Sequence, residues 1–326
     1  MKAYKQQDIR SHNLQLLKNI LRRHVQAMTK KQLADASALS VVTINKLIPA
    51  LVEAQDVLAL EIPQKTGGRF AQMYQFNAQK ALLLVLQFIE QDSAMIVRSV
   101  VVDLLGKPIF QQEQPVSSVQ QFLTEAAHLV KQFPQIAQTI VGIPGAEVDG
   151  RLKIMDVDAF RDVALSDLLA SELGHPVSVE NDINAATLGY ARASQQIVAG
   201  VYFPEAFPPG SALVVNQQIF KGRNQLSGEI KHLAQFSLAT MAFQEVVQMA
   251  SQAIVAMYDP EEVVCYLNSQ LQTRVDKARL QANLANIFPY GVLPEIIFST
   301  HFEADYLDGL IKLGLNQMEQ QAGEDE

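Results

Sequence analysis

The segment that decides the fold runs Val177-Ser178-Val179-Glu180-Asn181-Asp182-Ile183-Asn184-Ala185-Ala186. Its first three residues are typical of a short strand, and the polar pair Asn181-Asp182 follows directly. Ligands of α/β domains usually bind at the carboxyl ends of strands, which makes this pair a candidate binding site. Taken alone, the pair fits a helix cap before Ile183 better than a binding site, because Asn and Asp side chains accept hydrogen bonds from the first N–H groups of a helix.

The segments before this stretch alternate between strand and helix patterns, which indicates an α/β domain. The first three strands follow one another closely and suggest an antiparallel meander, with Leu105-Gly106-Lys107 joining the last two. Gly145 ends a further strand, as Asn181 and Asp182 follow theirs. Strands are predicted at about 81–89, 95–104, 108–114 and 140–145, and helices at about 119–132 and 165–173.

The first 77 residues have a different pattern, with short amphipathic helices followed by two strands. Thr29-Lys30-Lys31-Gln32 fits a capping box, which predicts a short helix from Lys30 to about Ser37. Ser40 is expected to cap a second helix, whose apolar positions are Ile44, Leu47, Ile48 and Leu51. A short helix, a tight turn and a longer helix are typical of a helix-turn-helix.

The strands predicted at 56–60 and 71–76 are bridged by Pro63-Gln64-Lys65-Thr66-Gly67-Gly68-Arg69, which has the composition of a wing. Together these elements predict a winged helix-turn-helix whose polar and basic side chains contact bases or phosphates. A generic helix pair with a hairpin is the alternative interpretation. The expected DNA contacts are Lys30, Lys31, Ser40, Thr43, Asn45, Lys46, Lys65 and Arg69.

Charge is distributed unevenly along the chain, whose net charge is -8. Residues 1–77 hold eleven Lys and Arg against five Asp and Glu, a balance of +6. The remaining residues hold fifteen against twenty-nine, a balance of -14. A basic N-terminal part suits a double-stranded DNA partner, because Lys and Arg contacts to phosphates supply much of the affinity of DNA-binding proteins.

Other features of the 326-residue sequence predict a cytoplasmic protein of two or three folding units. Apolar residues make up 48% of the chain, and no stretch has the pattern of a signal peptide or a membrane span, so no membrane partner is expected. The single cysteine, Cys265, lies in an apolar run and is expected to be a buried, inert thiol.

Several motifs in the chain resemble the ROK family of repressors and sugar kinases. The most specific are Glu180 to Ala186 and Gly222 to His232, and the segments Val141 to Gly145, Leu33 to Ser40 and Gly67-Gly68-Arg69 are also similar. The resemblance implies a winged helix-turn-helix at 1–77 and an actin-like, ribonuclease H-like body. The body would have α/β lobes at 78–190 and 191–326, the second lobe including the C-terminal helix.

The resemblance also implies a sugar in the cleft between the lobes. Carboxylate and amide groups suit such a ligand, because they accept from and donate to adjacent hydroxyls. In the family's kinases the aspartate that matches Asp182 is the base that deprotonates the sugar hydroxyl. The expected sugar-binding residues are Gly145, Asn181, Asp182, Glu229 and His232.

Three departures from the family pattern argue against ATP as a cofactor. The family's kinases carry a glycine-rich phosphate turn after the first strand, where this chain has Gln87 to Ser93 with no glycine and with Glu90. The second phosphate loop is replaced by Phe203 to Gly210, which contains three prolines and therefore few amide donors. A third turn, usually with two glycines, reads Leu267-Asn268. We therefore expect no catalytic residue, no cofactor and no enzymatic activity.

The zinc site of many ROK proteins has no counterpart in the sequence. Three closely spaced cysteines are usual after the histidine that matches His232, but this chain has Phe236 to Phe243 there, without a cysteine. No bound metal is therefore expected. Lys231, where the family usually has glycine, and Arg161 raise the hypothesis of a phosphorylated sugar, although a solvent-facing Lys231 is the simpler alternative.

These patterns favour a regulator that binds a palindromic operator as a homodimer or higher homo-oligomer and responds to a small carbohydrate effector. Repression of carbohydrate genes is the expected role. One alternative is an active sugar kinase with an accessory DNA-binding head. Another is a regulator whose body serves only for dimerisation or protein docking.

Overall fold

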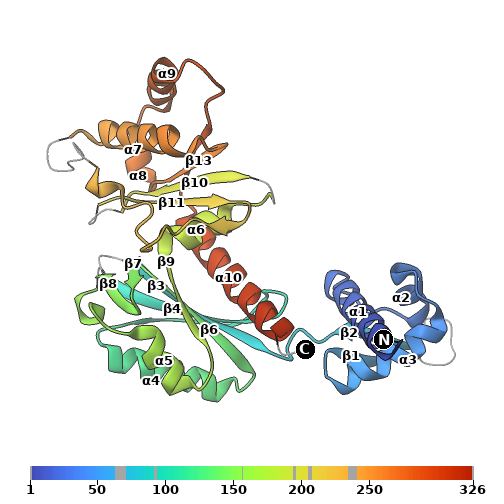
Figure 1. The fold of residues 1–326 in the computed structure, drawn as a ribbon. Coiled ribbons are helices and arrows are strands. Elements are labelled where there is room, and N and C mark those ends of the chain that lie inside the picture. Colours follow the sequence, from blue (N-terminus) through green and yellow to red (C-terminus); the bar gives the residue numbers. More distant parts are fainter. Residues whose placement is uncertain are drawn as a thin grey trace. The chain divides into compact units, whose positions relative to one another are not determined.

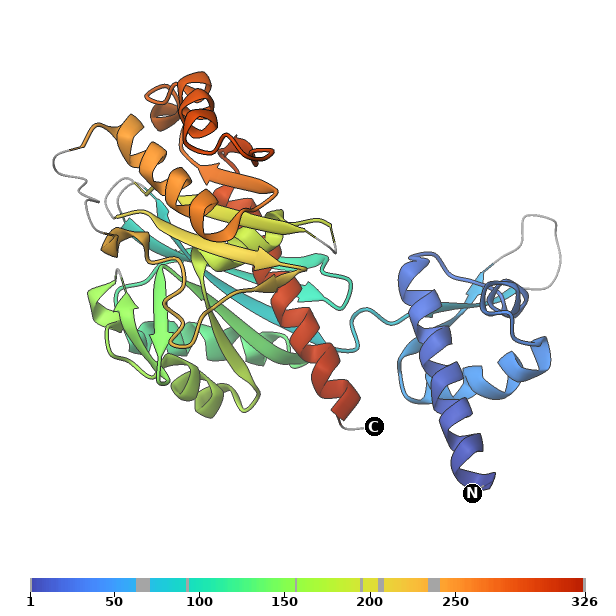
Figure 2. The same ribbon diagram turned by 45° about the horizontal axis from the view of Figure 1, so that its top comes forward.

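The computed structural model describes residues 2–62, 71–91, 94–155, 157–193, 196–204, 208–233 and 241–324. The chain divides into two compact units, which Figures 1 and 2 draw as ribbons. We call Met1–Leu82 with Asp103–Lys107 the head, and Leu83–Val102 with Pro108–Glu326 the body. No single helix among the described residues is long and apolar enough to cross a membrane. The pair of helices at Lys30–Ser37 and Val41–Glu53 passes such a test only when taken together, and it is bent by 109°.

The head consists of α1 (Lys2–Arg23), α2 (Lys30–Ser37), α3 (Val41–Glu53), β1 (Val57–Ile62) and β2 (Ala71–Phe76). The two strands pair antiparallel, with Val57 opposite Phe76. One apolar face of each helix closes a shared core with the strands, because every helix carries apolar residues at helical spacing. The four predicted apolar positions of α3 are all buried: Ile44, Leu47, Ile48 and Leu51.

Both predicted helix starts in the head are confirmed by their caps. The Thr29 hydroxyl accepts from the Gln32 N–H at 3.3 Å, and the Gln32 side chain accepts from the Thr29 N–H at 2.8 Å. The Ser40 hydroxyl accepts from the Thr43 N–H at 3.1 Å. Each cap satisfies a backbone donor that has no partner within the helix.

The body contains two five-stranded sheets (Figure 1). The first contains β3 (Leu82–Gln91), β4 (Ala94–Asp103), β5 (Pro108–Pro115), β6 (Ile136–Ile143) and β9 (Val177–Asn181), in the order β5-β4-β3-β6-β9. The second contains β10 (Ile197–Tyr202), β11 (Gly210–Val215), β12 (Gln218–Ile219), β13 (Glu262–Tyr266) and β14 (Glu295–Ser299), in the order β12-β11-β10-β13-β14. Numbered within each sheet, the strands of both follow the order 3-2-1-4-5, so one topology occurs twice.

The strands predicted at 81–89, 95–104 and 108–114 are observed with small shifts, and both predicted helices have the predicted bounds. The strand predicted to end at Gly145 is wrong at its end, because β6 stops at Ile143 before Pro144 and Gly145 begins a new strand. The β4–β5 pair is antiparallel, whereas β6 and β9 are parallel, with Ile143 opposite Asn181. Parallel pairing requires a long crossover, and the chain between β6 and β9 supplies it. The remaining elements are α4 (Val119–Gln132), β7 (Gly145–Val148), β8 (Arg151–Met155), η1 (Asp158–Phe160), α5 (Leu165–Leu173), α6 (Asp182–Tyr190), η2 (Ile230–His232), α7 (Phe243–Tyr258), α8 (Ser269–Gln272), α9 (Lys277–Ile287) and α10 (Phe302–Glu324).

Helices α6 and α10 pack closely against each other within the body (Figure 1). A side-chain carbon at Gly309 would lie 1.8 Å from the Ala185 carbonyl oxygen, and one at Gly189 would lie 1.9 Å from that of Asp305. Glycine at both positions therefore lets the two backbones approach. Tyr306 and Leu310 of α10 share one apolar core with strands of both sheets. The C-terminal helix, which was predicted to belong to the second lobe at 191–326, also packs on α6 and β6.

Candidate sugar-binding site

The body holds a pocket of about 130 Å³. The elements that form it come from both sheets and from the helices between them. The end of β3 contributes Glu90, and the start of β7, which pairs with β8, contributes Gly145. The start of α6 contributes Asn181 and Asp182, and the start of α10 contributes Phe302. A cleft with many hydrogen-bonding groups and aromatic faces fits a small polar ligand.

Asn181 and Asp182 take part in the structure of the helix start as well as lining the pocket. The Asn181 side-chain oxygen accepts from the Asn184 N–H at 3.0 Å, which makes Asn181 the N-cap of α6. Its amide group donates to the Gly145 carbonyl at 2.8 Å and to Asp182 at 2.9 Å. The helix-cap interpretation is therefore correct for Asn181, and it does not exclude ligand contacts from the same pair.

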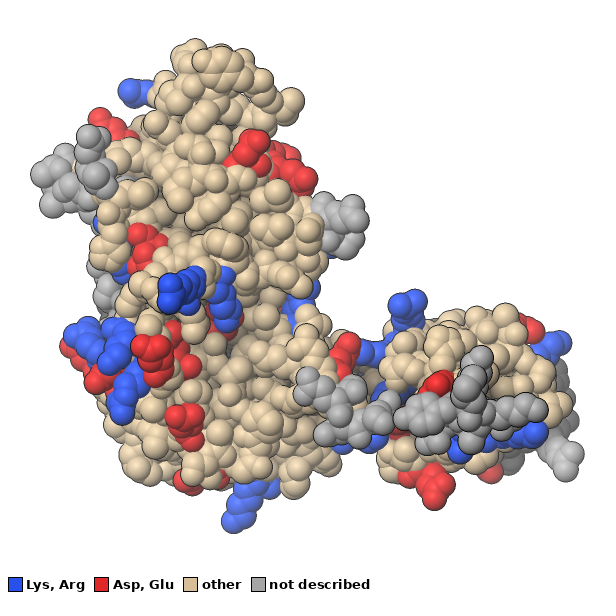
Figure 3. Space-filling model, viewed as in Figure 1, with Lys and Arg blue, Asp and Glu red and all other residues tan. Residues whose placement is uncertain are grey.

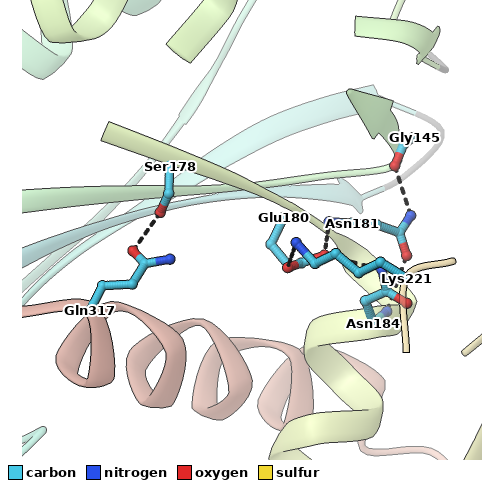
Figure 4. A network of polar contacts seen from close by, with 7 residues as sticks. All are labelled: Gly145, Ser178, Glu180, Asn181, Asn184, Lys221 and Gln317. Atoms are coloured by element: carbon cyan, nitrogen blue, oxygen red, sulfur yellow. Dashed lines mark hydrogen bonds and ion pairs between the residues drawn. The ribbon is translucent and has the colours of Figure 1, made fainter. Parts of the chain in front are cut away.

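The buried carboxylate of Glu180 stabilises the start of α6 through hydrogen bonds (Figure 4). Glu180 accepts hydrogen bonds from the Asn181 backbone N–H and the Asn184 side chain, each at 3.0 Å. Lys221 forms an ion pair with Glu180 at 2.7 Å. The cation compensates for the burial of the carboxylate, which would otherwise be costly. Lys221 was not among the predicted site residues, because no local pattern reports which buried acid a lysine will reach.

Glu229 is held in the pocket by the glycine that precedes it. The Gly228 backbone has φ +92°, and its carbonyl accepts from the Ser211 N–H at 2.9 Å. A side chain at Gly228 would meet the Ser211 carbonyl oxygen at 1.8 Å, so only glycine fits against β11. Glu229 forms an ion pair with Lys231 at 2.8 Å, and both line the pocket. His232, which ends η2, is exposed and is not among the lining residues.

Two of the three places expected to lack phosphate loops line the pocket, and the third, Leu267-Asn268, does not. Glu90 lines it at the end of β3. Pro204, Pro208 and Pro209 line it beyond β10, and residues 205–207 lie outside the described residues. After β13, Asn268 caps α8 by accepting from the Leu271 N–H at 2.7 Å. Carboxylate and proline side chains offer a phosphate group no hydrogen-bond donor.

Aromatic residues that the sequence did not single out form one wall of the pocket. The rings of Tyr202 and Phe302 stack in parallel, with centroids 3.7 Å apart and planes at 7°. Phe302 also meets Tyr266 edge-on at 5.2 Å. One hundred residues of sequence separate Tyr202 from Phe302. Only the tertiary fold brings the two rings together.

The two residues that raised the hypothesis of a phosphorylated sugar lie in different surroundings. Arg161 is exposed, forms an ion pair with Asp158 at 2.8 Å and does not line the pocket. Lys231 lines the pocket but pairs with Glu229. No group of three or more metal-ligating side chains occurs within the described parts of the chain. Most of the segment expected to replace a zinc site falls in the undescribed residues 234–240.

Six of the eight predicted DNA-contacting residues lie on or near α2 and α3. Lys31, Ser40, Asn45 and Lys46 are exposed. Lys30 and Thr43 are partly buried, and the Lys30 ammonium lies 5.8 Å from the centre of the Tyr74 ring. Lys65 and Arg69 lie outside the described residues. Figure 3 shows several Lys and Arg side chains on the visible face of the head.

The fold of the chain is shared with solved structures of regulators and sugar kinases. A ROK family transcriptional regulator, described as a homolog of the E. coli MLC protein, matches with a TM-score of 0.59 and 13% identity over 94% of this chain and 99% of that chain. A ROK hexokinase from Thermus thermophilus matches with a TM-score of 0.57 and 15% identity, covering 73% of this chain and 99% of that one. At these identities the similarity shows the fold alone. The body therefore has the actin-like fold that it shares with solved sugar kinases.

Sequence similarity identifies the family within that class. Residues 97–266 match the ROK family, which is more than half of the chain. The chain belongs to the ROK family. It is 22% identical to the xylose repressor of Bacillus subtilis (strain 168) over 234 residues, 67% of this chain and 59% of that protein. It is 31% identical to the N-acetyl-D-glucosamine kinase of Vibrio atlanticus (strain LGP32) over 129 residues, 36% of this chain and 42% of the kinase. The match thus spans about six tenths of the xylose repressor's length.

Proposed function

We propose that this chain is a DNA-binding transcriptional regulator, a repressor of carbohydrate genes, whose body binds a sugar without phosphorylating it. The observation that carries the proposal is the composition of the pocket. Carboxylate and amide groups suited to sugar hydroxyls line one part of it, and Glu90 with three prolines lines the part where the family's kinases would need phosphate ligands. Phosphoryl transfer requires a nucleotide and its magnesium to be held in place, and these residues offer no means to hold them.

The head supports the DNA-binding part of the proposal. The bend of 109° between α2 and α3 lies within the range of helix-turn-helix motifs. Ser40, Asn45 and Lys46 are exposed around the start of α3, which is the part of a recognition helix that enters the major groove. We assign the head as a winged helix-turn-helix, with β1, β2 and the segment between them as the wing.

Sugar binding would regulate the head by favouring one conformation of the protein. A ligand shifts an equilibrium only when it binds two conformations unequally. The pocket collects residues from both sheets, so a sugar that contacts both would favour a closed body. In a homodimer on a two-fold operator, such closure would change the spacing of the two heads.

The DNA-binding proposal is tested with the full-length protein and an operator selected from randomised DNA. Replacing Lys46 by Ala should weaken binding to every sequence and lower the salt slope by about one, if the side chain contacts a phosphate. The matched control is Lys131→Ala, on an exposed position of α4 in the body, which should leave binding unchanged. Selection of no DNA, or binding insensitive to salt, would contradict the proposal.

An active sugar kinase is the second candidate function, because Asp182 lines the pocket where a general base would act. Its test is a coupled assay of ATP turnover in the presence of D-glucose, D-xylose and N-acetyl-D-glucosamine. Sugar-dependent turnover that disappears in Asp182→Asn would establish the kinase and overturn sensing without catalysis. We expect the ATP turnover of the wild-type protein to be no higher than that of Asp182→Asn.

A further inference from the structure

We propose that Glu90 is a specificity-determining residue that makes the pocket select sugars without a phosphate group. The inference rests on the proposed function, in which the body binds a sugar. It adds the chemical class of that sugar and the residue that sets it.

The charges that line the pocket are mostly negative. Its described lining contains four carboxylates, Glu90, Asp182, Glu229 and Glu303, and one cation, Lys231. A phosphorylated sugar brings close to two negative charges into this pocket at neutral pH. An uncharged sugar brings hydroxyl groups, which donate hydrogen bonds to carboxylates.

The one cation in the described lining is already paired. The Lys231 ammonium lies 2.8 Å from the Glu229 carboxylate, so its charge is largely compensated before any ligand arrives. Glu303 is paired in turn with Arg98 at 3.0 Å, and Arg98 also binds Glu113 at 2.6 Å. Arg98 does not line the pocket. A phosphate group would therefore have to compete with an existing carboxylate for either cation.

Glu90 differs from these paired acids. None of the ion pairs among the described residues involves Glu90. The strand fixes its position, since Phe88 and Ile89 before it are both buried. The pocket lining beyond β10 includes three prolines, Pro204, Pro208 and Pro209. Because proline has no backbone N–H, these residues cannot donate hydrogen bonds to a phosphate and so cannot offset its repulsion by Glu90. Glu90 therefore presents to a phosphate group a negative charge that pairs with no cation of the described residues.

The test measures affinities by titration calorimetry with four named probes. These are D-glucose, D-glucose 6-phosphate, N-acetyl-D-glucosamine and N-acetyl-D-glucosamine 6-phosphate. For a sugar that binds the wild-type protein, we expect its phosphate to bind at least about tenfold more weakly, as expected for one repulsive charge in a partly screened pocket. Raising the salt concentration should reduce this ratio.

Glu90→Gln keeps the size of the side chain and removes its charge. The readout is the ratio of the affinity for a sugar to the affinity for its phosphate. This ratio should fall by about tenfold in the variant. The matched control is Glu172→Gln, at an exposed position of α5 outside the pocket, which should leave the ratio unchanged. Melting curves of both variants report whether each is folded.

The outcomes separate the inference from the function on which it rests. Equal or tighter binding of the phosphorylated sugar by the wild-type protein would overturn the role of Glu90 and leave sugar sensing intact. An unchanged ratio in Glu90→Gln would do the same. Binding of none of the four probes by the folded wild-type protein would refute both the sensing of these sugars and the selectivity.

Discussion

Replacing Gly309 by Ala should destabilise the body, because the new methyl group has no space. Its carbon would lie 1.8 Å from the carbonyl oxygen of Ala185, whereas ordinary contacts begin at 3.4 Å. The obstacle is backbone of α6 and cannot rotate away, so α6 and α10 must separate by roughly 1.5 Å. Overpacking of this kind costs about 3 kcal/mol at the upper end of its usual range.

A second effect of the same substitution acts in the opposite direction. Alanine is favoured over glycine inside a helix by about 1 kcal/mol. The net loss in the free energy of unfolding should therefore be about 2 kcal/mol. For a unit of the size of the body, this corresponds to a fall in Tm of about 4–8 °C.

Thermal unfolding followed by circular dichroism measures this loss. The control is Gly291→Ala, because a side-chain carbon at Gly291 would meet no atom within 4 Å. A Tm for Gly309→Ala equal to or above that of the wild-type protein would refute the close approach of the helices. The variant should also weaken sugar binding, because α6 begins at Asp182 and α10 begins at Phe302, and both residues line the pocket.

Three further predictions concern single side chains. Thr29→Ala removes the capping box of α2 and should lower the free energy of unfolding of the head, measured in urea, by about 1 kcal/mol. The control is Asp35→Ala, at an exposed position of α2 that takes no part in the cap, and it should not lower this free energy. Burial raises the pKa of the Cys265 thiol to about 12, so a thiol reagent at about pH 8 should label only the unfolded protein, and rapid labelling of the folded protein would contradict its burial. Burial also raises the pKa of Asp305 above its ordinary 3.8, so the folded protein holds this proton at a pH where the unfolded chain has lost it. Stability should therefore fall as the pH rises from about 4 through the raised pKa, and urea unfolding of Asp305→Asn should show a smaller fall than the wild-type protein.

Much of the local structure could be predicted from the sequence. The caps at Thr29 and Ser40 depend on residues three positions apart, so a short pattern contains all that is needed. The helix at Leu165–Leu173 was also predicted with its observed bounds. The absence of glycine between Gln87 and Ser93 is likewise a property of the sequence alone.

The ionic partners in the candidate site could not be predicted in this way. Lys231 appeared in the sequence as a free cation near the site, and in the structure its charge is paired with Glu229. Lys221 directly precedes a recognised motif, yet its partner Glu180 is more than forty residues away. Ion pairs between distant segments depend on side-chain position and burial, which sequence spacing does not report.

Local sequence therefore determined the helices and their caps, because each depends on interactions within a few residues. The charge difference between head and body and the absence of phosphate-binding glycines can be read from the sequence directly. Tertiary structure decided which of the candidate residues share a pocket, that Tyr202 stacks on Phe302, and that Gly189 and Gly309 allow α6 to touch α10. It also placed Glu90 in the lining of the same pocket. These properties arise from the packing of segments far apart in the chain, where the compensation of a charge or the space for a methyl group depends on what the fold places beside it.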